Sequence, residues 1–161
     1  KLYWLLHHAG VETGVFGLGS AFARPKAVAD FMRQHDLKFN EVANNIVYCL
    51  APHADRNAGT RFLALCRRDA VVWWRSRYGD TLRAFQTFIL PPRTGAMYKA
   101  DNWKQLGQTT GGVAQSVRTL RREEHDQYPK AECHTFKSGE VRYLLREFHV
   151  TTPKLIFMRL A

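Results

Sequence analysis

Tyr98 is the residue of this chain best suited to acid–base chemistry, because it stands in a short predicted helix between two turns. The Pro91-Pro92 pair ends the preceding strand pattern, and Thr94 can cap a helix with room for about two turns. Three apolar residues at a spacing of three should share one face of this helix: Met97, Ala100 and Trp103. Tyr98 then lies at the edge of that face. A phenol in this position can act as an acid if it faces a cleft, and can otherwise pack as a structural residue.

The second set of candidate residues lies in the loop from 53 to 60, between a predicted strand and a long predicted helix. Unpaired backbone N–H groups and the helix dipole favour a bound anion at such a junction, and Gly59 lets the backbone approach a phosphate closely. Asp55 and His53 are the nearest candidates for a general base, with loop or capping roles as the alternative. The P-loop lysine and the glycine fingerprint of dinucleotide-binding folds are absent, which argues against a nucleoside triphosphatase or a Rossmann dehydrogenase.

The charge of the chain favours a polyanionic partner. Its 161 residues contain 24 Lys and Arg against 14 Asp and Glu, for a net charge of +10 and a pI near 9.9. The basic residues cluster in two regions, which favours phosphate contacts over a merely solvated surface: Arg67, Arg68, Arg75, Arg77 and Arg83 in one, and Arg118, Arg121 and Arg122 in the other. Helix-turn-helix and zinc-finger spacings are absent.

Metal, membrane and disulfide chemistry have little support in the sequence. The seven histidines are scattered without a His-x-x-x-His pair, so we expect no metal. No run reaches the ~18 apolar residues of a membrane span, and no signal peptide is recognisable. Cys49, Cys66 and Cys133 lack metal-ligand spacing, and we expect them to be buried thiols in a reducing cytoplasm. The start of the chain at Lys1 rather than Met suggests a trimmed N-terminus.

The elements that would position these residues alternate between strand and helix. We expect one domain over residues 1–161, of the α/β (α+β) class, with helices on both faces of a mixed sheet. The helix between the strands at 45–50 and 81–90 is a crossover, so those two strands should run parallel. The expected elements are a hairpin over 1–22, a helix from Pro25, a buried strand at 45–50, a helix ending near Tyr78-Gly79, a strand at 81–90, a helix over about 114–125, a segment at 140–150 and an edge strand at 154–160.

Taken together, these motifs resemble the acyl-CoA-binding core of the GNAT acetyltransferase superfamily. The shared pattern is a strand, an Arg-x-x-Gly loop, a long helix, a strand, and a short helix bearing Tyr and ending in Asn-Trp-x-x-x-Gly. The resemblance implies a partly splayed sheet, a bound acetyl-CoA or other acyl-CoA, and Tyr98 as the acid that protonates the departing thiolate. It assigns the cofactor to Arg56, Asn57, Gly59, Thr60, Arg61 and Asn102. Arg61 departs from the family, which has Gly or Ala at that position.

A narrower likeness covers residues 45 to 115. The segments Arg-Asn-Ala-Gly-Thr-Arg-Phe-Leu and Gly-x-x-Tyr-Lys-Ala-x-Asn-Trp-x-x-Leu-Gly-x-Thr resemble the Mom family of phage DNA-modification proteins. That resemblance implies acyl-type modification of the adenine N6 amine in double-stranded DNA, in the cytoplasm of a bacterial host, protecting phage DNA from restriction. Base flipping would then be needed, with Trp103, Tyr48 or Phe88 stacking on the base. The usual Ser-Tyr-Ala-Asp is absent, and Gln86-Thr87-Phe88 stands near its place.

Two alternatives stay open. The first is a catalytically inert GNAT-fold module for DNA binding or anti-restriction, suggested by Arg61 and by the missing Ser-Tyr-Ala-Asp. The second is a GNAT acetyltransferase of a protein or small amine, with an incidental positive charge. Under the leading hypothesis, phosphate contacts are expected from Arg67, Arg68, Arg75, Arg118, Arg121 and Arg122.

Overall fold

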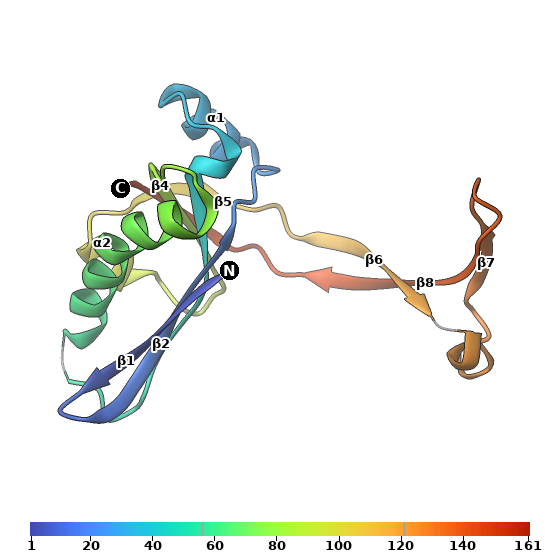
Figure 1. Cartoon of the computed structure of the whole chain (residues 1–161), viewed down its shortest axis with the longest axis horizontal. Coiled ribbons are helices and arrows are strands. Elements are labelled where there is room, and N and C mark those ends of the chain that lie inside the picture. Colours follow the sequence, from blue (N-terminus) through green and yellow to red (C-terminus); the bar gives the residue numbers. More distant parts are fainter. Residues whose placement is uncertain (56, 121) are drawn as a thin grey trace. The chain divides into compact units, whose positions relative to one another are not determined.

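The computed structural model describes residues 1–55, 57–120 and 122–161, without the side chains of residues 113–115, 122 and 126 (Figure 1). Arg56 and Arg121 therefore lie outside the described residues, as does the side chain of Arg122. The chain forms two compact units, one made of Lys1–Thr109 with Lys154–Ala161 and the other of Thr110–Pro153.

The first unit is built on a six-stranded mixed sheet. Its order is β1 (Leu2–His8), β2 (Val11–Ser20), β3 (Val42–Leu50), β4 (Ala84–Ile89), β9 (Leu155–Leu160) and β5 (Lys104–Gln108). β3 and β4 are parallel, and the other neighbouring strands of this sheet are antiparallel. The predicted hairpin and the predicted parallel pair are thus confirmed, as is the mixed α+β class.

Helices cover both faces of this sheet, as expected. The helices are α1 (Lys26–Gln34), α2 (Ala58–Tyr78), the short α3 (Ala96–Ala100) and the 3-10 helix η1 (Phe39–Glu41). Side chains alternate along each strand, so Ala84 faces the cluster with α1 while its neighbour Phe85 faces α2. Ile156 and Phe157 of β9 divide in the same way. The sheet is therefore buried on both sides where β3, β4 and β9 lie.

Two glycines set the helix ends that flank β4. α2 ends at Gly79, whose φ of 75° lies in the left-handed region that glycine adopts readily, and this end was predicted. α3 begins at Ala96 with Gly95 as its N-cap, whose φ is 71° and which makes no side-chain cap, so the predicted cap by Thr94 is wrong. A Cβ at Gly95 would lie 2.6 Å from the ring of Phe157. Glycine is required here both by conformation and by packing.

Strand β9 is central, and the expectation of an edge strand after Pro153 is wrong. β9 lies between β4 and β5, and Ile156, Phe157 and Met158 are fully buried. Pro153 lies before the strand, so every N–H from Leu155 to Leu160 is available to the two ladders. The edge strand on this side of the sheet is β5, a polar segment for which the sequence predicted no strand.

The second unit is a three-stranded antiparallel sheet of order β6 (Gly112–Leu120), β8 (Val141–Thr151) and β7 (Glu132–Thr135), with a 3-10 helix η2 (Arg122–Gln127). The helix expected over 114–125 is wrong. β-branched Val117 and Thr119 favour an extended backbone, and pairing with all of 143–151 supplies hydrogen bonds between strands.

In the described part of the chain, no helix has the length and apolar character needed to cross a membrane.

Candidate active site

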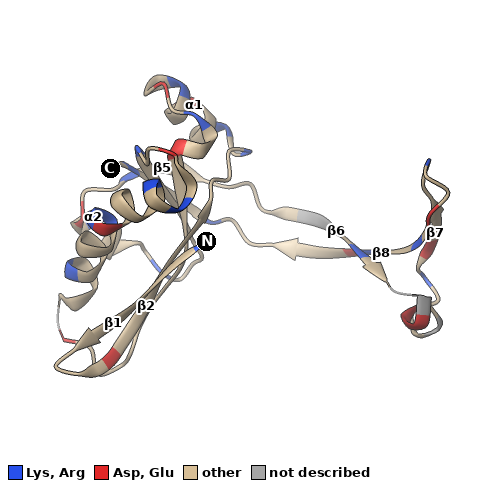
Figure 2. Ribbon diagram, viewed as in Figure 1, with Lys and Arg blue, Asp and Glu red and all other residues tan. Residues whose placement is uncertain are grey.

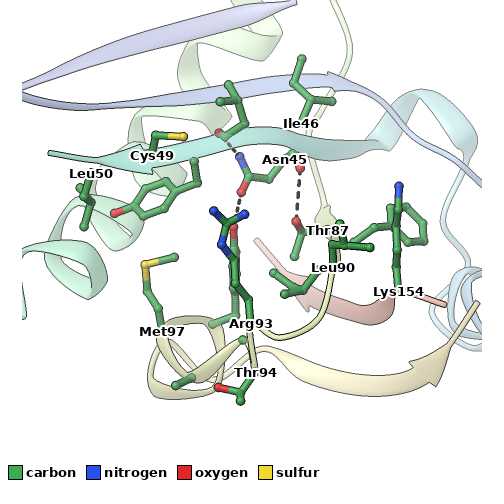
Figure 3. A pocket seen from close by; sticks show the side chains of 17 residues that line it. Asn45, Ile46, Cys49, Leu50, Thr87, Leu90, Arg93, Thr94, Met97 and Lys154 are labelled. Atoms are coloured by element: carbon green, nitrogen blue, oxygen red, sulfur yellow. Dashed lines mark hydrogen bonds between the residues drawn. The ribbon is translucent and has the colours of Figure 1, made fainter. Parts of the chain in front are cut away.

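The two central parallel strands separate halfway along their length. Their register runs from Val42↔Ala84 to Asn45↔Thr87 and ends there. Beyond that point β3 continues beside β2 to Leu50, and β4 continues beside β9 to Ile89. A pocket of about 700 Å³ opens where the strands diverge (Figure 3). The partly splayed sheet that the sequence predicted is therefore present.

Asn45 lies at the vertex of the divergence and is only 6% exposed. The register with β2 shifts between Gly17 and Leu18, which leaves Ile46 as the extra residue of a β-bulge. The Asn45 side chain compensates for the interrupted ladder, because its Nδ2 donates to the carbonyl oxygens of Gly17 (2.9 Å) and Val47 (2.8 Å). Its amide oxygen is thereby aimed into the pocket.

Tyr98 lines the same pocket and is held by Asn45. The Tyr98 Oη donates to Asn45 Oδ1 at 2.5 Å, and the Thr87 hydroxyl donates to the Asn45 carbonyl oxygen at 3.2 Å. The tyrosine ring packs edge-on against Trp103 and stacks on Phe157. Burial raises the pKa of Tyr98 to about 12, although its hydrogen bond with Thr87 and the charge of Arg93 act in the opposite direction. The phenol therefore stays protonated at neutral pH.

The charged side chains that line the pocket are both cationic. They are Arg93, in the turn after β4, and Lys154, just before β9. Figure 3 shows Arg93 pointing into the pocket toward Asn45. Among the described residues that line the pocket there is no Asp or Glu. The site combines apolar strand walls, a phenol and two positive charges.

The first turn of α2 adjoins this pocket. The Tyr48 hydroxyl donates to the Gly59 carbonyl oxygen at 2.5 Å, and burial raises the pKa of Tyr48, which keeps it a donor. A Cβ on Gly59 would lie 2.9 Å from the Met97 sulfur and 3.1 Å from a Leu50 methyl group. The first turn of α2 and α3 therefore pack against each other at Gly59 and Met97. The space that Gly59 leaves is occupied by Met97, so this glycine serves the packing of α2 against α3.

The candidate bases lie apart from the pocket lining. Asp55 is exposed and its carboxylate lies 3.2 Å from His8 Nε2, while His53 is exposed in the same loop. Asn57 is the exposed N-cap of α2 in the left-handed conformation, and Asn102 is exposed with φ 59°. Thr60 is half-buried in the first turn of α2. The structure brings none of these five side chains to the pocket.

Two predicted DNA contacts belong to the interior. Arg67 is buried and donates to both carboxylate oxygens of Asp101 at 2.7 and 3.1 Å, and the buried Trp103 donates its Nε1 to Asp101 at 2.9 Å. Arg159 Nη1 lies 3.4 Å from the same carboxylate. Arg67 cannot reach phosphates and Trp103 cannot stack on a base, so both predictions are corrected. Arg67 differs from its neighbour Arg68 by about 100° around the helix, which turns it inward.

The cysteines divide by position. Cys66 is buried, and burial raises the pKa of its thiol to about 12. The expectation of three buried thiols is wrong for Cys49 and Cys133, which are exposed. Cys49 also lines the pocket. The described residues contain no group of three His, Cys, Asp or Glu side chains that could hold a metal ion.

Sequence reasoning missed the residues that shape the pocket: Asn45, Cys49, Arg93 and Lys154. The signal for Asn45 was an Asn-Asn pair inside an apolar strand, where polar amides need internal partners.

In comparisons with known proteins, no family model and no curated protein matches this chain.

Proposed function

We propose that this protein is a GNAT-like acyltransferase of the Mom type, which moves an acyl group from acetyl-CoA or another acyl-CoA to the adenine N6 amine of double-stranded DNA and so protects phage DNA from restriction. One observation carries the proposal. β3 and β4 run parallel to Asn45↔Thr87 and then diverge, and the hydroxyl of Tyr98 lies at the point of divergence. An open pair of strand ends offers both backbone polar groups and space to an extended ligand.

The residues around the pocket fit an acyl-CoA. Its apolar walls suit a pantetheine chain, Arg93 and Lys154 suit phosphates, and the start of α2 adjoins the pocket through Gly59. Such a thioester, when bound, would supply an activated acyl group: the bond from carbonyl carbon to sulfur breaks as the bond to the amine nitrogen forms, and the departing thiolate takes up the proton that the amine loses. Tyr98 serves there as a hydrogen-bond donor once its hydroxyl turns its one proton from Asn45 Oδ1 toward the sulfur. With a pKa of about 12, complete transfer of its proton to an ordinary thiolate of pKa ~8.5 would be uphill by about 5 kcal/mol.

The charge of the pocket favours a base amine over an alkylamine as the acceptor. A lysine or polyamine nitrogen has a pKa of ~10.4 and is cationic at pH 7. It would meet Arg93 and Lys154, and no carboxylate among the described lining residues could neutralise or deprotonate it. An exocyclic base amine is uncharged and is carried on an anionic backbone that the two cations attract. The charge therefore counts against a GNAT enzyme that acts on a protein or small amine.

The inert DNA-binding or anti-restriction module is the second candidate. It is favoured by the placement of Asp55 and His53 outside the pocket lining, because no base then stands ready for the acceptor. The two candidates differ in one property that can be measured directly. An acyltransferase binds acyl-CoA in the pocket, and the inert module does not.

Cys49 provides the test, with its control in the same molecule. We expect millimolar acetyl-CoA to slow alkylation of Cys49 by a maleimide at least several-fold, while Cys133 in the second unit reacts at an unchanged rate. Mass spectrometry of the two peptides measures both rates. Arg93→Gln should weaken the protection. Equal rates at Cys49 with and without acetyl-CoA would rule out the enzyme and leave the inert module.

Transfer itself is measured on duplex DNA. After incubation with protein and acetyl-CoA, the DNA is digested to nucleosides, and we expect a deoxyadenosine whose mass is raised by one acyl group. Tyr98→Phe should lower the rate while leaving the protection of Cys49 in place, because the ring still fills its site. Protection of Cys49 without any modified nucleoside would place the acceptor elsewhere.

A further inference from the structure

The outward side of α2 carries a regular row of arginine and apolar side chains. At 100° per residue, five side chains lie within about 40° of one line along the helix: Arg61, Leu65, Arg68, Val72 and Arg75. We call them the α2 stripe. Leu65 is 51% exposed and Val72 69% exposed, and the three arginines are exposed as well. The opposite side of α2 carries Leu63, Cys66, Ala70 and Trp74 into the core.

The arginines of the stripe differ from most other exposed arginines in having no acidic partner. Arg33, Arg83, Arg118, Arg142 and Arg146 each form a salt bridge. In the described part of the chain, no salt bridge joins Arg61, Arg68 or Arg75 to a carboxylate. Successive arginines of the stripe are about 10 Å apart along the helix, which is close to the Debye length at physiological ionic strength. Their mutual repulsion is relieved when a polyanion binds.

The distribution of charge between the two units points the same way. Residues 110–153 contain seven Lys and Arg and six Asp and Glu, so nearly all of the net charge of +10 belongs to the first unit. α2 carries five arginines and one acidic residue, Asp69, whereas the second unit carries the two signs in nearly equal number (Figure 2). Arg118, a predicted phosphate contact, is paired with Glu124 at 2.8 Å and lies over the ring of Tyr128.

We infer that the α2 stripe is a docking surface for the phosphate backbone of nucleic acid. A second copy of the chain is the poorer occupant, because it would set arginine against arginine. Duplex DNA carries one charge per ~1.7 Å of axis when both strands are counted, so the ~21 Å from Arg61 to Arg75 spans a length of duplex that holds about twelve phosphates. Leu65 and Val72, between the arginines, meet the less polar sugars. The inference rests on the proposed function in one respect only, namely that the bound nucleic acid is DNA.

The stripe also changes the assignment of Arg61. The sequence grouped it with the cofactor loop, but the helix turns it to the same side as Arg68 and Arg75. Arg61 is exposed and does not line the pocket between β3 and β4. Of the predicted DNA contacts on α2, Arg68 and Arg75 stay on the surface and Arg67 does not.

The experiment compares two double variants with equal loss of charge. Arg68→Gln with Arg75→Gln removes two members of the stripe, and Lys26→Gln with Lys104→Gln removes two exposed lysines from α1 and β5. The dissociation constant for a fluorescent DNA duplex is measured by anisotropy against salt concentration. Each lost phosphate contact should reduce the log–log slope by about 0.9, so the stripe variant should lose about 1.8 and the control much less. A further Arg61→Gln should bring the loss to about 2.7.

The experiment distinguishes failure of the α2 stripe as a docking surface from failure of the proposed function. Equal slopes for the two double variants overturn the α2 stripe as a nucleic-acid surface. Self-association of the wild-type chain that disappears in the stripe variant, with DNA binding unchanged, assigns the stripe to a second copy. A matched single-stranded oligonucleotide tests duplex preference. Protection of Cys49 by acetyl-CoA in the stripe variant reports on the pocket alone, so its loss or retention judges the proposed function independently.

Discussion

Gly95 is the position where one added methyl group should disturb the candidate site most directly. It is the N-cap of α3, in the left-handed conformation, and a Cβ added there would point at the ring of Phe157, which is fully buried. The ring of Phe157 in turn stacks on Tyr98 with centroids 6.1 Å apart. Gly95→Ala therefore acts on the backbone of α3 and on the packing beneath Tyr98 together.

The expected loss of stability has two parts. The positive φ of 71° costs about 1–2 kcal/mol for alanine. The new Cβ, 2.6 Å from two carbon atoms of the Phe157 ring, adds about 1–3 kcal/mol of overpacking because the ring has no free space to enter. Gly95→Ala should therefore lower the free energy of unfolding by about 2–5 kcal/mol, a large part of the ~5–15 kcal/mol typical of a domain.

Gly79→Ala is the matched control. Gly79 has nearly the same φ, 75°, and a Cβ there would have no neighbour within 4 Å. Its cost should be the conformational ~1–2 kcal/mol alone. Urea unfolding followed by tryptophan fluorescence measures both variants, since all four tryptophans lie in the first unit: Trp4, Trp73, Trp74 and Trp103. The fluorescence signal therefore comes from the first unit.

The difference between the two variants isolates the packing contribution. Equal losses for Gly95→Ala and Gly79→Ala would refute the close approach of α3 to Phe157. The activity of Gly95→Ala on duplex DNA should also fall below that of Gly79→Ala, because the first variant displaces the tyrosine and the second does not.

Three further expectations follow from the same contacts. Folding raises the pKa of Tyr98 from an ordinary 10.0 to about 12. The free energy of unfolding should therefore be highest below pH 10 and fall by up to about 2–3 kcal/mol between pH 10 and 12. Thermal melts should find a smaller fall in Tyr98→Phe. Asp101→Ala should cost about 3–5 kcal/mol in urea unfolding because it leaves Arg67 buried without its carboxylate, whereas the volume-matched Arg67→Met should cost less. Joining Thr109 to Lys154 through Gly-Gly should leave a cooperatively folding first unit in fluorescence-monitored melts, because the Thr109 N–H already donates to the Lys154 carbonyl at 2.9 Å.

Each of these has a contrary result. An identical pH dependence in wild type and Tyr98→Phe would mean that the phenol does not ionise in that window. If Arg67→Met is as damaging as Asp101→Ala, the ion pair contributes more than the desolvation of its charges allows. Loss of cooperativity after deletion of residues 110–153 would show that the first unit depends on the second.

The elements that could be predicted from the sequence were those whose signals are local. These elements are the hairpin over 1–22, the helix from Pro25 and the glycine end of α2, and each is marked by residues close to its own turn or boundary. β6 was mistaken for a helix because its extended form is stabilised by β8, which lies some 30 residues further along the chain.

The residues of the candidate site also differ in whether a local sequence signal marks them. Tyr98 and Gly59 could be found as motifs, because each stands beside a turn or helix start that the sequence marks. Asn45 could not, because its role follows from a register shift between β2 and β3 and from a hydroxyl on α3. The inward turn of Arg67 is set by Asp101, a carboxylate that composition treats as one more surface charge.

The position of β9 has a consequence for how the chain folds during synthesis. β9 completes the ladders of both β4 and β5, yet it follows the whole second unit in the chain, and Leu160 pairs with Ala84. Until it emerges, β4 has one unpaired edge, and Tyr98, which stacks on Phe157, lacks that contact. Such long-range closure is slow, and open strand edges are prone to intermolecular pairing. We expect newly made chains to pass through a stage at which they depend on chaperones, which ends when β9 is inserted.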